Sequence, residues 1–476
     1  MQRELSLVAN QDVSRVRRAL SRIGNSTEGV MKEKPGVSSV NDAPASPSRR
    51  KVLIGGAVAA GAAVMLGSSP RLFAAAPGKE IRIGYISPRS GDLGAFNQSD
   101  SYMLPLVRKA LAKGLKIGGE TYKVTILDRD GQSSPSRASQ LAKELIDREN
   151  INLMLTTSTP ETVNPVSDAC EAAGVPSIGT DCPLESFYFG RGAKPGQPSP
   201  FKWSFDFSFG VAQFVDGYLA QWPMLKTNKK VAVMYPNDAD GSAFREHLAP
   251  VLKKNGYTVV DPGPYQDGTT DFSSQIALFN RENCQIFNEV GLPPDLQAFW
   301  RQAAQLHFLD KLIIAQFTKS GSFYNQILAL GALGPNVCAE TFWAPVFPYK
   351  SPLTGGTSQE LADGYEKATG HIWAEQQGAT LALFEVGVAV LKGTKDPTNR
   401  AAIRDVIPTL DMITTLGRVN FKKGPYPNTA TTPMIGAQWV KTPPGSKFQL
   451  DWVTINNAED RNVPVQRKPV PYNVRG

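Results

Sequence analysis

The chain has 476 residues, too many for one ordinary hydrophobic core, and 41% of them are hydrophobic, which is typical of a globular protein of two or three domains. The formal net charge is +8, but residues 1–76 hold 11 Lys and Arg against 5 Asp and Glu and so contribute +6 of it. The remainder is nearly neutral, which argues against nucleic acid as a partner.

Residues 1–76 have the features of an export signal. A basic stretch at 48–51 precedes an apolar run at 52–67 that is rich in Gly and Ala, and Ala74-Ala75-Ala76 follows. A charged region, a short apolar segment and small residues before a boundary are typical of a signal peptide. The paired arginines are similar to those of a twin-arginine signal, although Val52 stands where that motif usually has Phe. We therefore predict a periplasmic protein whose signal is cleaved near Ala74–Ala76.

Two properties of this leader stay open. A membrane anchor is the alternative to a cleaved signal, but the apolar run is shorter than the roughly 20 strongly apolar residues that cross a bilayer. The leader is also long and basic ahead of the arginines, and translation from either Met1 or Met31 is compatible with the pattern.

The mature chain begins with alternating strand and helix patterns, which are typical of a parallel α/β sheet. We expect strands at 81–86, 122–127, 153–155 and 175–178, and helices at 102–111 and 137–146 and after 159. After a loop rich in Gly and Pro, aromatic residues stand at alternate positions from Phe201 to Phe209. Period two indicates a strand with one aromatic face, which we expect to pack in the core.

A second α/β series begins at Val231. We expect strands at 231–235, 257–260, 285–288 and 312–315, with helices through 248–252 and at 272–279 and 296–306. After about residue 340 the pattern is helical, at 361–368, 381–391 and 403–410, and the tail has short strands at 419–421, 438–440 and 450–453. The predicted fold class is α/β, with two halves divided near residue 200.

Polar residues follow two strands of the first half. Thr156–Thr159 end one apolar run, and Gly179–Cys182 end the next. Open parallel sheets bind ligands at the carboxyl ends of their strands, and the free backbone N–H groups at a helix start suit a carboxylate. The alternative is that these hydroxyls only cap the following helix.

Five segments carry a resemblance to a known family: IRIGYISPRSGDLGAF at 81–96, the stretch 152–183, KVAVMYPNDADGSAF at 230–244, DFSSQIALF at 271–279 and TTLGRVNF at 414–421. They resemble the periplasmic solute-binding proteins of ABC importers, specifically the leucine/isoleucine/valine-binding, or type I periplasmic binding protein, family. The resemblance covers nearly all of 79–455. It implies two lobes, each a mostly parallel sheet flanked by helices, joined by a three-segment hinge. We assign 79–200 and 340–415 to lobe 1, and 201–339 and 416–476 to lobe 2.

The resemblance also implies a function. Such a protein captures a small amino-acid-like solute in the cleft between the lobes and delivers it to the transmembrane subunits of an ABC permease, as a monomer. Two alternatives stay open: the same role for an aromatic or aliphatic carboxylic acid or amide, and a ligand-sensing receptor module.

The residues point to no catalysis, cofactor or metal. The three histidines, His247, His307 and His371, are far apart and have no ligand spacing. A phosphate-binding loop is missing, and so is a Gly-x-Ser-x-Gly nucleophile elbow. We therefore expect a binding protein rather than an enzyme.

The resemblance implies eight ligand-binding residues. Phe96 stands where the family often has an aromatic lid, and Ser158 or Thr159 where a hydroxyl holds the carboxylate of the ligand. Thr180 and Asp181 fall in the next loop, which in amino-acid binders meets the carboxylate and the ammonium. The loops of the second lobe contribute Glu289, Gly291 and Ser320.

The chain departs from the family pattern in the second lobe. Leu292-Pro293 occupies the loop where aliphatic amino-acid binders have tyrosines, and the usual acidic residue near Ser320 is missing. Asp181 and Glu289 are candidates to replace the lost negative charge. Their alternative roles are a turn residue for Asp181 and a salt-bridged strand end for Glu289.

Four cysteines, Cys170, Cys182, Cys284 and Cys338, allow three full pairings in an oxidising compartment. Cys170 and Cys182 flank one helix-to-strand connection and are candidates to approach each other. Buried free thiols are the alternative.

Overall fold

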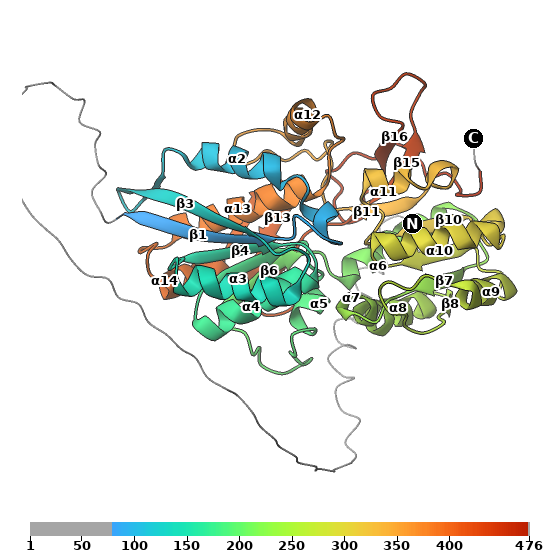
Figure 1. Ribbon diagram of the computed structural model, residues 1–476, viewed down its shortest axis with the longest axis horizontal. Coiled ribbons are helices and arrows are strands. Elements are labelled where there is room, and N and C mark those ends of the chain that lie inside the picture. The colour runs from blue at the N-terminus through green and yellow to red at the C-terminus, as the bar shows by residue number, and fades with distance from the viewer. Residues whose placement is uncertain (1–78, 475–476) are drawn as a thin grey trace, which may run out of the picture. The chain divides into compact units, whose positions relative to one another are not determined.

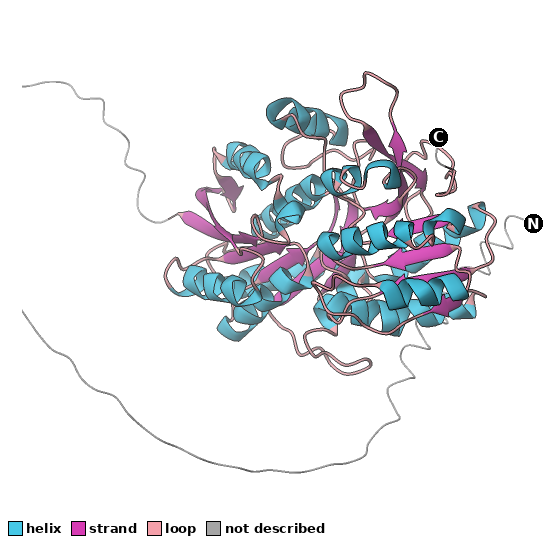
Figure 2. Ribbon diagram, turned by 45° about the vertical axis from the view of Figure 1, so that its right-hand side comes forward, coloured by secondary structure: helices cyan, strands magenta, loops and turns pink. Residues whose placement is uncertain are grey.

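The computed structural model describes residues 79–474, so the export signal predicted at 1–76 lies outside the described residues. Within them the chain forms two seven-stranded sheets and one two-stranded sheet, and helices lie on both sides of each large sheet (Figures 1 and 2). The predicted α/β fold with two lobes is confirmed. We call the part built on the first large sheet the first lobe, and the part built on the other the second lobe.

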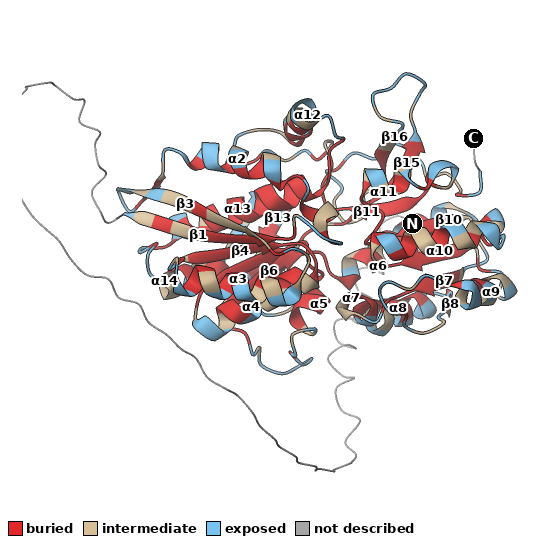
Figure 3. Ribbon diagram, in the orientation of Figure 1, coloured by how far each residue is buried: buried red, intermediate tan, exposed pale blue. Residues whose placement is uncertain are grey.

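The sheet of the first lobe is parallel except at one edge, where β2 runs antiparallel to β3. Its strand order is β14 (Thr429–Thr431), β6 (Ser204–Ser208), β5 (Ser177–Thr180), β4 (Leu153–Thr157), β1 (Glu80–Ser87), β3 (Glu120–Asp130), β2 (Leu115–Ile117). Strands β4, β5 and β6 are buried along their whole length (Figure 3). Helices on both faces cause this, because a parallel sheet covered on both sides has no solvent face.

The sheet of the second lobe is parallel at one end and antiparallel at the other, where β15 pairs with both β11 and β16. Its strand order is β16 (Leu450–Asn456), β15 (Ile435–Lys441), β11 (Cys338–Thr341), β10 (Ile314–Phe317), β9 (Ile286–Glu289), β7 (Lys230–Met234), β8 (Thr258–Val260). The strands predicted in both series are therefore present. The two-stranded sheet joins β12 (Asp411–Thr414) and β13 (Gly417–Asn420).

The helices cover the faces of these sheets. Those of the first lobe are α2 (Asp100–Leu111), α3 (Pro135–Asp147), α4 (Pro160–Ala173), α5 (Leu184–Tyr188), α12 (Ser358–Thr369), α13 (Gln376–Gly393) and α14 (Arg400–Val406). Those of the second are α6 (Val211–Gln221), α7 (Ala239–Ala243), α8 (Ala249–Lys254), α9 (Ser273–Arg281), α10 (Pro293–Gln305) and α11 (Tyr324–Leu328). Short 3-10 or π turns are η2 (Gly94–Asn97), η3 (Trp222–Met224), η4 (Phe244–Leu248), η5 (Leu309–Lys311), η6 (Gly331–Leu333), η7 (Ile407–Thr409) and η8 (Phe421–Lys423).

The aromatic strand predicted from alternating phenylalanines is β6. Phe205 and Phe207 are buried, and both rings contact Phe421 edge to face. The prediction of an aromatic face packed in the core is confirmed for Phe205 and Phe207, whereas Phe201 and Trp203 precede the strand and Trp203 is only partly buried.

The chain passes between the two large sheets after β6, after β11 and after β14. The first passage therefore comes after Ser208 and not near residue 200, and 429–431 pair with the first sheet although we expected 416–476 in lobe 2. The difference arises because β14 pairs in parallel with β6, and the rings of β6 pack on Phe421 a few residues before β14.

All four cysteines lie in the described part of the chain, where each is buried as a free thiol. Of the two alternatives, the structure has the free thiols, and Cys170 and Cys182 are not bridged. None of the described helices combines the length and apolarity that crossing a membrane requires.

Candidate ligand-binding site

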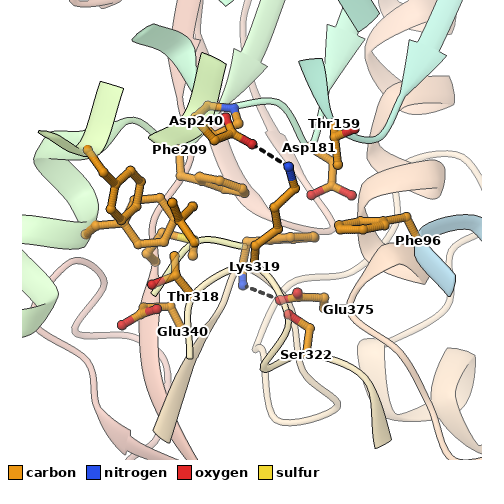
Figure 4. Close-up of a pocket in the computed structure, with 16 residues that line it drawn as sticks. Phe96, Thr159, Asp181, Phe209, Asp240, Thr318, Lys319, Ser322, Glu340 and Glu375 are labelled. Carbon is orange, nitrogen blue, oxygen red and sulfur yellow. Dashed lines mark hydrogen bonds and ion pairs between the residues drawn. The ribbon is translucent and has the colours of Figure 1, made fainter. Parts of the chain in front are cut away.

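A narrow cavity lies where the strand ends of the two lobes face each other. Loops after β4, β5 and β6 reach it from the first lobe, and loops after β9, β10 and β11 reach it from the second. The lining residues are Phe96, Thr159, Asp181, Pro183, Phe209, Phe214, Asp240, Phe244, Val290, Thr318, Lys319, Ser322, Glu340, Phe342, Glu375 and Met434 (Figure 4). This is the position at which open parallel sheets bind ligands.

The cavity encloses about 40 Å³. Roughly 10–15 Å³ of such space holds one water molecule, whereas ligand pockets have about 300–1,000 Å³. The two lobes are therefore closed onto each other, and a solute can enter only if they separate or their side chains move.

Phenylalanines form much of the apolar wall. Phe209 stacks on Phe342 with ring centroids 5.4 Å apart, and its edge also meets Phe214. Phe96 comes from the loop after β1 and packs against Phe323 of the second lobe, with centroids 4.7 Å apart and ring planes at 75°. These rings offer flat apolar surface to a solute and also hold the two lobes together.

Lys319, in the loop after β10, is the buried cation of the cavity wall. Its ammonium lies 2.8 Å from Asp240 and 3.8 Å from both Asp238 and Glu161. Burial alone lowers the pKa of Lys319, but the surrounding carboxylates more than offset this and hold its pKa well above the usual range. The lysine is therefore charged and already neutralised by its neighbours.

Asp181, after β5, is a buried acid without a fixed partner. Only 7% of the residue is exposed, and its Oδ2 atom has no hydrogen-bond partner among the described residues. Burial, together with the nearby acids Glu375, Asp206 and Asp240, raises the pKa of Asp181 well above its ordinary value. Such a carboxyl group is ready to pair with a cation that enters the cavity.

Two glutamates complete the polar wall. Glu340 on β11 accepts a hydrogen bond from Gln316 Nε2 at 2.7 Å through Oε1, while its Oε2 atom is buried without a partner among the described residues. Glu375, at the start of α13, accepts a hydrogen bond from the backbone of Phe342 at 3.1 Å. Burial raises the pKa of Glu340 well above its ordinary range and that of Glu375 to about 7.

Of the eight residues predicted for the site, Phe96, Thr159 and Asp181 line the cavity. Thr159 is also the N-cap residue of α4, but its side chain makes no cap hydrogen bond. Ser158, one residue earlier, is buried with no hydrogen-bond partner for its hydroxyl among the described residues, and its φ of 110° is strained for a residue other than glycine.

The other four predicted residues do not line the cavity. Thr180 donates its hydroxyl to the carbonyl of Phe207 at 2.7 Å, inside the sheet. In the second lobe, Ser320 donates to the carbonyl of Gly291 at 2.7 Å and to Glu289 at 3.2 Å, and the N–H of Gly291 donates to Glu289 at 2.6 Å. The polar groups of these three residues form hydrogen bonds with one another and stabilise their own loops.

Sequence reasoning missed several cavity residues. Asp240 ends the sequence Asn-Asp-Ala-Asp after β7 and lies in the first turn of α7, and Phe209 ends the aromatic alternation, so the local sequence pointed to a turn for one and to a core position for the other. Glu340 and Glu375 had none, because one lies inside a strand and the other on the segment that returns to the first lobe. Among the described residues there is no cluster of His, Cys, Asp and Glu that could hold a metal ion.

Two lobes with a cavity between their strand ends define a binding protein of the periplasmic type. The sequence profile of the family described as Periplasmic binding protein matches residues 80–444, and the chain belongs to this family. A curated relative, Leu/Ile/Val-binding protein homolog 7 of Brucella suis, is 23% identical over 396 residues, which cover 79% of this chain and 93% of the relative.

Solved structures share the fold. The leucine binding protein LivK of Thermotoga maritima has a TM-score of 0.64 at 16% identity and covers 79% of this chain and 99% of its own. The branched-chain amino acid transporter substrate binding protein LivJ of Streptococcus pneumoniae, in complex with isoleucine, has a TM-score of 0.61 at 16% identity. The match covers 83% of this chain and 100% of LivJ. A solute binding protein of Rhodopseudomonas palustris, in complex with 3,4-dihydroxybenzoic acid, has a TM-score of 0.62 at 15% identity. The match covers 79% of this chain and 96% of that protein.

Proposed function

We propose that this protein is the extracytoplasmic solute-binding subunit of an ABC importer. It captures a small amino-acid-like solute between its lobes and delivers it to the transmembrane permease subunits, as a monomer and without catalysis. The protein is exported to the periplasm, and its signal is cleaved near Ala74–Ala76. The observation that carries the proposal is the cavity between the lobes, which is lined by Asp181, whose Oδ2 atom has no hydrogen-bond partner among the described residues.

The groups around the cavity suit an amino acid. The carboxyl group of Asp181 supplies a partner for an ammonium group. Thr159 lines the cavity at the start of α4, where the positive end of a helix dipole favours a carboxylate. The phenylalanine wall accommodates an apolar or aromatic side chain. Membership of the family and the isoleucine bound to the LivJ structure agree with this class of solute.

An aromatic acid is the second candidate. The phenylalanines of the cavity favour it, and a structure with the same fold holds 3,4-dihydroxybenzoic acid. Against it stand the acids of the cavity, because a buried carboxylate from the solute would face carboxyl groups of the protein.

A thermal-shift and calorimetry panel on the mature chain tests the proposal. Each amino acid is paired with the acid that lacks its amino group, and a ligand at about 100 times its Kd adds about 2.7 kcal/mol to stability. We expect amino acids to stabilise the protein and their des-amino partners not to. Equal stabilisation by both would favour the second candidate, and a compound that is chemically converted would contradict a binding-only role.

Delivery needs a separate test. The permease subunits reconstituted in vesicles should take up the stabilising solute only when this protein is added on the outside. Uptake that does not depend on the protein would contradict its role as the importer subunit.

A further inference from the structure

The walls of the cavity carry more acids than bases. Its lining contains four carboxyl groups, from Asp181, Asp240, Glu340 and Glu375, against one ammonium group, from Lys319. Lys319 also meets Glu161 and Asp238, which lie outside the lining. Carboxyl groups therefore outnumber the ammonium group around the cavity.

The carboxylates around Lys319 disfavour binding of an anionic solute to its ammonium group. Its ammonium already has carboxylates at 2.8, 3.8 and 3.8 Å, and the donor bond to Asp240 is a short charge-assisted one. An anionic solute would therefore have to approach this ammonium against the charge of the carboxylates that already surround it.

Two buried carboxyl oxygen atoms of the cavity lining, one from each lobe, make no hydrogen bond with any described residue. They are Oδ2 of Asp181, in the first lobe, and Oε2 of Glu340, in the second. Asp181 is 7% exposed and Glu340 is 1% exposed. In Figure 4 the two side chains lie on opposite sides of Lys319. A buried acceptor without a partner costs stability, and a bound donor recovers that cost.

The apolar wall suits a cation as well. The stacked pair Phe209 and Phe342 and the ring of Phe96 line the same cavity as these acids. The face of an aromatic ring attracts an ammonium or guanidinium group, more strongly when water is excluded. The rings suit the apolar body of an organic cation, and the two carboxyl oxygens without a partner among the described residues suit its charged group.

We propose that the solute is an organic cation: a compound with an apolar body and an ammonium or guanidinium group that no carboxylate of its own balances, such as a basic amino acid or a diamine. This inference rests on the proposed function and narrows its solute class. Asp181 pairs with one positive group, and Glu340 receives a second donor.

A series of compounds with similar carbon chains and increasing positive charge tests the charge requirement on the wild-type protein. Hexanoate carries one negative charge, norleucine no net charge, lysine one positive charge and cadaverine two. Benzoate and benzylamine make the same comparison on an aromatic body. Calorimetry should find lysine at least about tenfold tighter than norleucine, the ratio that about 1.4 kcal/mol of charge-assisted hydrogen bonding produces. Hexanoate and benzoate should not bind.

Matched variants assign the effect to Asp181. Asp181→Asn should remove the preference for lysine over norleucine. Asp206→Asn is the control, because Asp206 is also a buried acid of the first lobe with no hydrogen bond from a described residue, but it lies on β6 outside the cavity lining. The control should keep the full preference. Equal loss in both variants would contradict the role of Asp181.

The outcomes separate the two proposals. Norleucine or hexanoate that binds as tightly as lysine would overturn the cation inference and leave the solute-binding function standing. No binding by any of the six compounds would overturn the cation inference, while the wider panel of amino acids would still decide the proposed function.

Discussion

The ammonium group of Lys319, in the second lobe, lies 3.8 Å from the carboxylate of Glu161, in the first lobe. The same ammonium donates to Asp240 at 2.8 Å, and the other oxygen of Asp240 accepts a hydrogen bond from the hydroxyl of Ser186, in the first lobe, at 2.6 Å. A buried set of polar contacts thus joins the two lobes beside the cavity. We infer that these contacts favour the closed arrangement of a protein whose lobes move about a hinge.

The first prediction concerns Glu161. Glu161→Gln removes the charge that Lys319 meets across the cleft and leaves the pair with Asp240 intact, so we expect a shift toward an open form. Small-angle scattering should give a larger radius of gyration than for the wild type. Asp168→Asn is the control, because Asp168 is on the same helix but pairs with Arg191 within the first lobe. An unchanged radius for Glu161→Gln would show that closure does not depend on this contact.

The second prediction concerns the ring pair across the cleft. Phe96 and Phe323 are buried, with Leu93 in the same small apolar cluster. A double-mutant cycle with Phe96→Leu and Phe323→Leu should give a coupling of about 0.5–1.5 kcal/mol in the free energy of solute binding, the usual contribution of an edge-to-face pair. The coupling arises because the two rings meet only when the lobes are closed.

The matched cycle uses Phe187 and Phe201, a ring pair at 6.2 Å that lies wholly within the first lobe. That pair should affect the free energy of unfolding but show no coupling in binding. Equal coupling in the two cycles would mean that Phe96 and Phe323 do not report on closure.

The third prediction is a loss of stability as the pH rises. Burial raises the pKa of Glu289 from 4.5 to about 8, despite the hydrogen bonds from Gly291 and Ser320 that lower it. A carboxyl group with a raised pKa binds its proton more tightly in the folded state than in the unfolded state. Its contribution is therefore complete below about pH 4.5 and is lost as the pH passes through about 8. Asp238, with a pKa raised to about 7, acts in the same direction.

Urea unfolding between about pH 5 and about pH 9 measures this effect as the slope of the free energy of unfolding against pH. Glu289→Gln should flatten the slope. Glu360→Gln should not, because hydrogen bonds from Thr357 lower the pKa of this exposed carboxyl group and its titration lies below the range. A wild-type stability that rises between these pH values would contradict the prediction.

The fourth prediction contrasts two threonines that the sequence alone treats alike. Thr159→Val removes a hydroxyl from the cavity wall and should weaken solute binding by about 0.5–1.5 kcal/mol, the net contribution of one hydrogen bond. Thr180→Val removes the bond to the carbonyl of Phe207 instead, so it should lower the free energy of unfolding and leave affinity unchanged. Calorimetry and urea unfolding on both variants separate the two roles. Weaker binding for Thr180→Val and lower stability alone for Thr159→Val would contradict this assignment.

Local patterns were sufficient for the elements and for part of the site. The apolar runs that became β1, β4, β7 and β9 could be recognised because buried parallel strands are short, continuous and bounded by turn residues. Thr159 and Asp181 could be found for the same reason: they directly follow strands, and the ends of parallel strands converge at one edge of the sheet.

The sequence by itself therefore determined the class of protein, the two lobes and the edge at which a ligand binds. Only the tertiary structure decided which side chains reach that ligand. Thr180 and Asp181 are neighbours in the chain, yet one hydroxyl points into the sheet and one carboxyl lines the cavity, because successive residues at a strand end face opposite ways. Glu340, in the second lobe, lines the same cavity as Asp181, more than 150 positions earlier in the sequence, only because the two lobes close on each other, and Glu375 reaches the cavity from the segment that returns to the first lobe. A local sequence pattern contains no information about a partner that is distant in the sequence, and the role of a buried charged group depends on that partner.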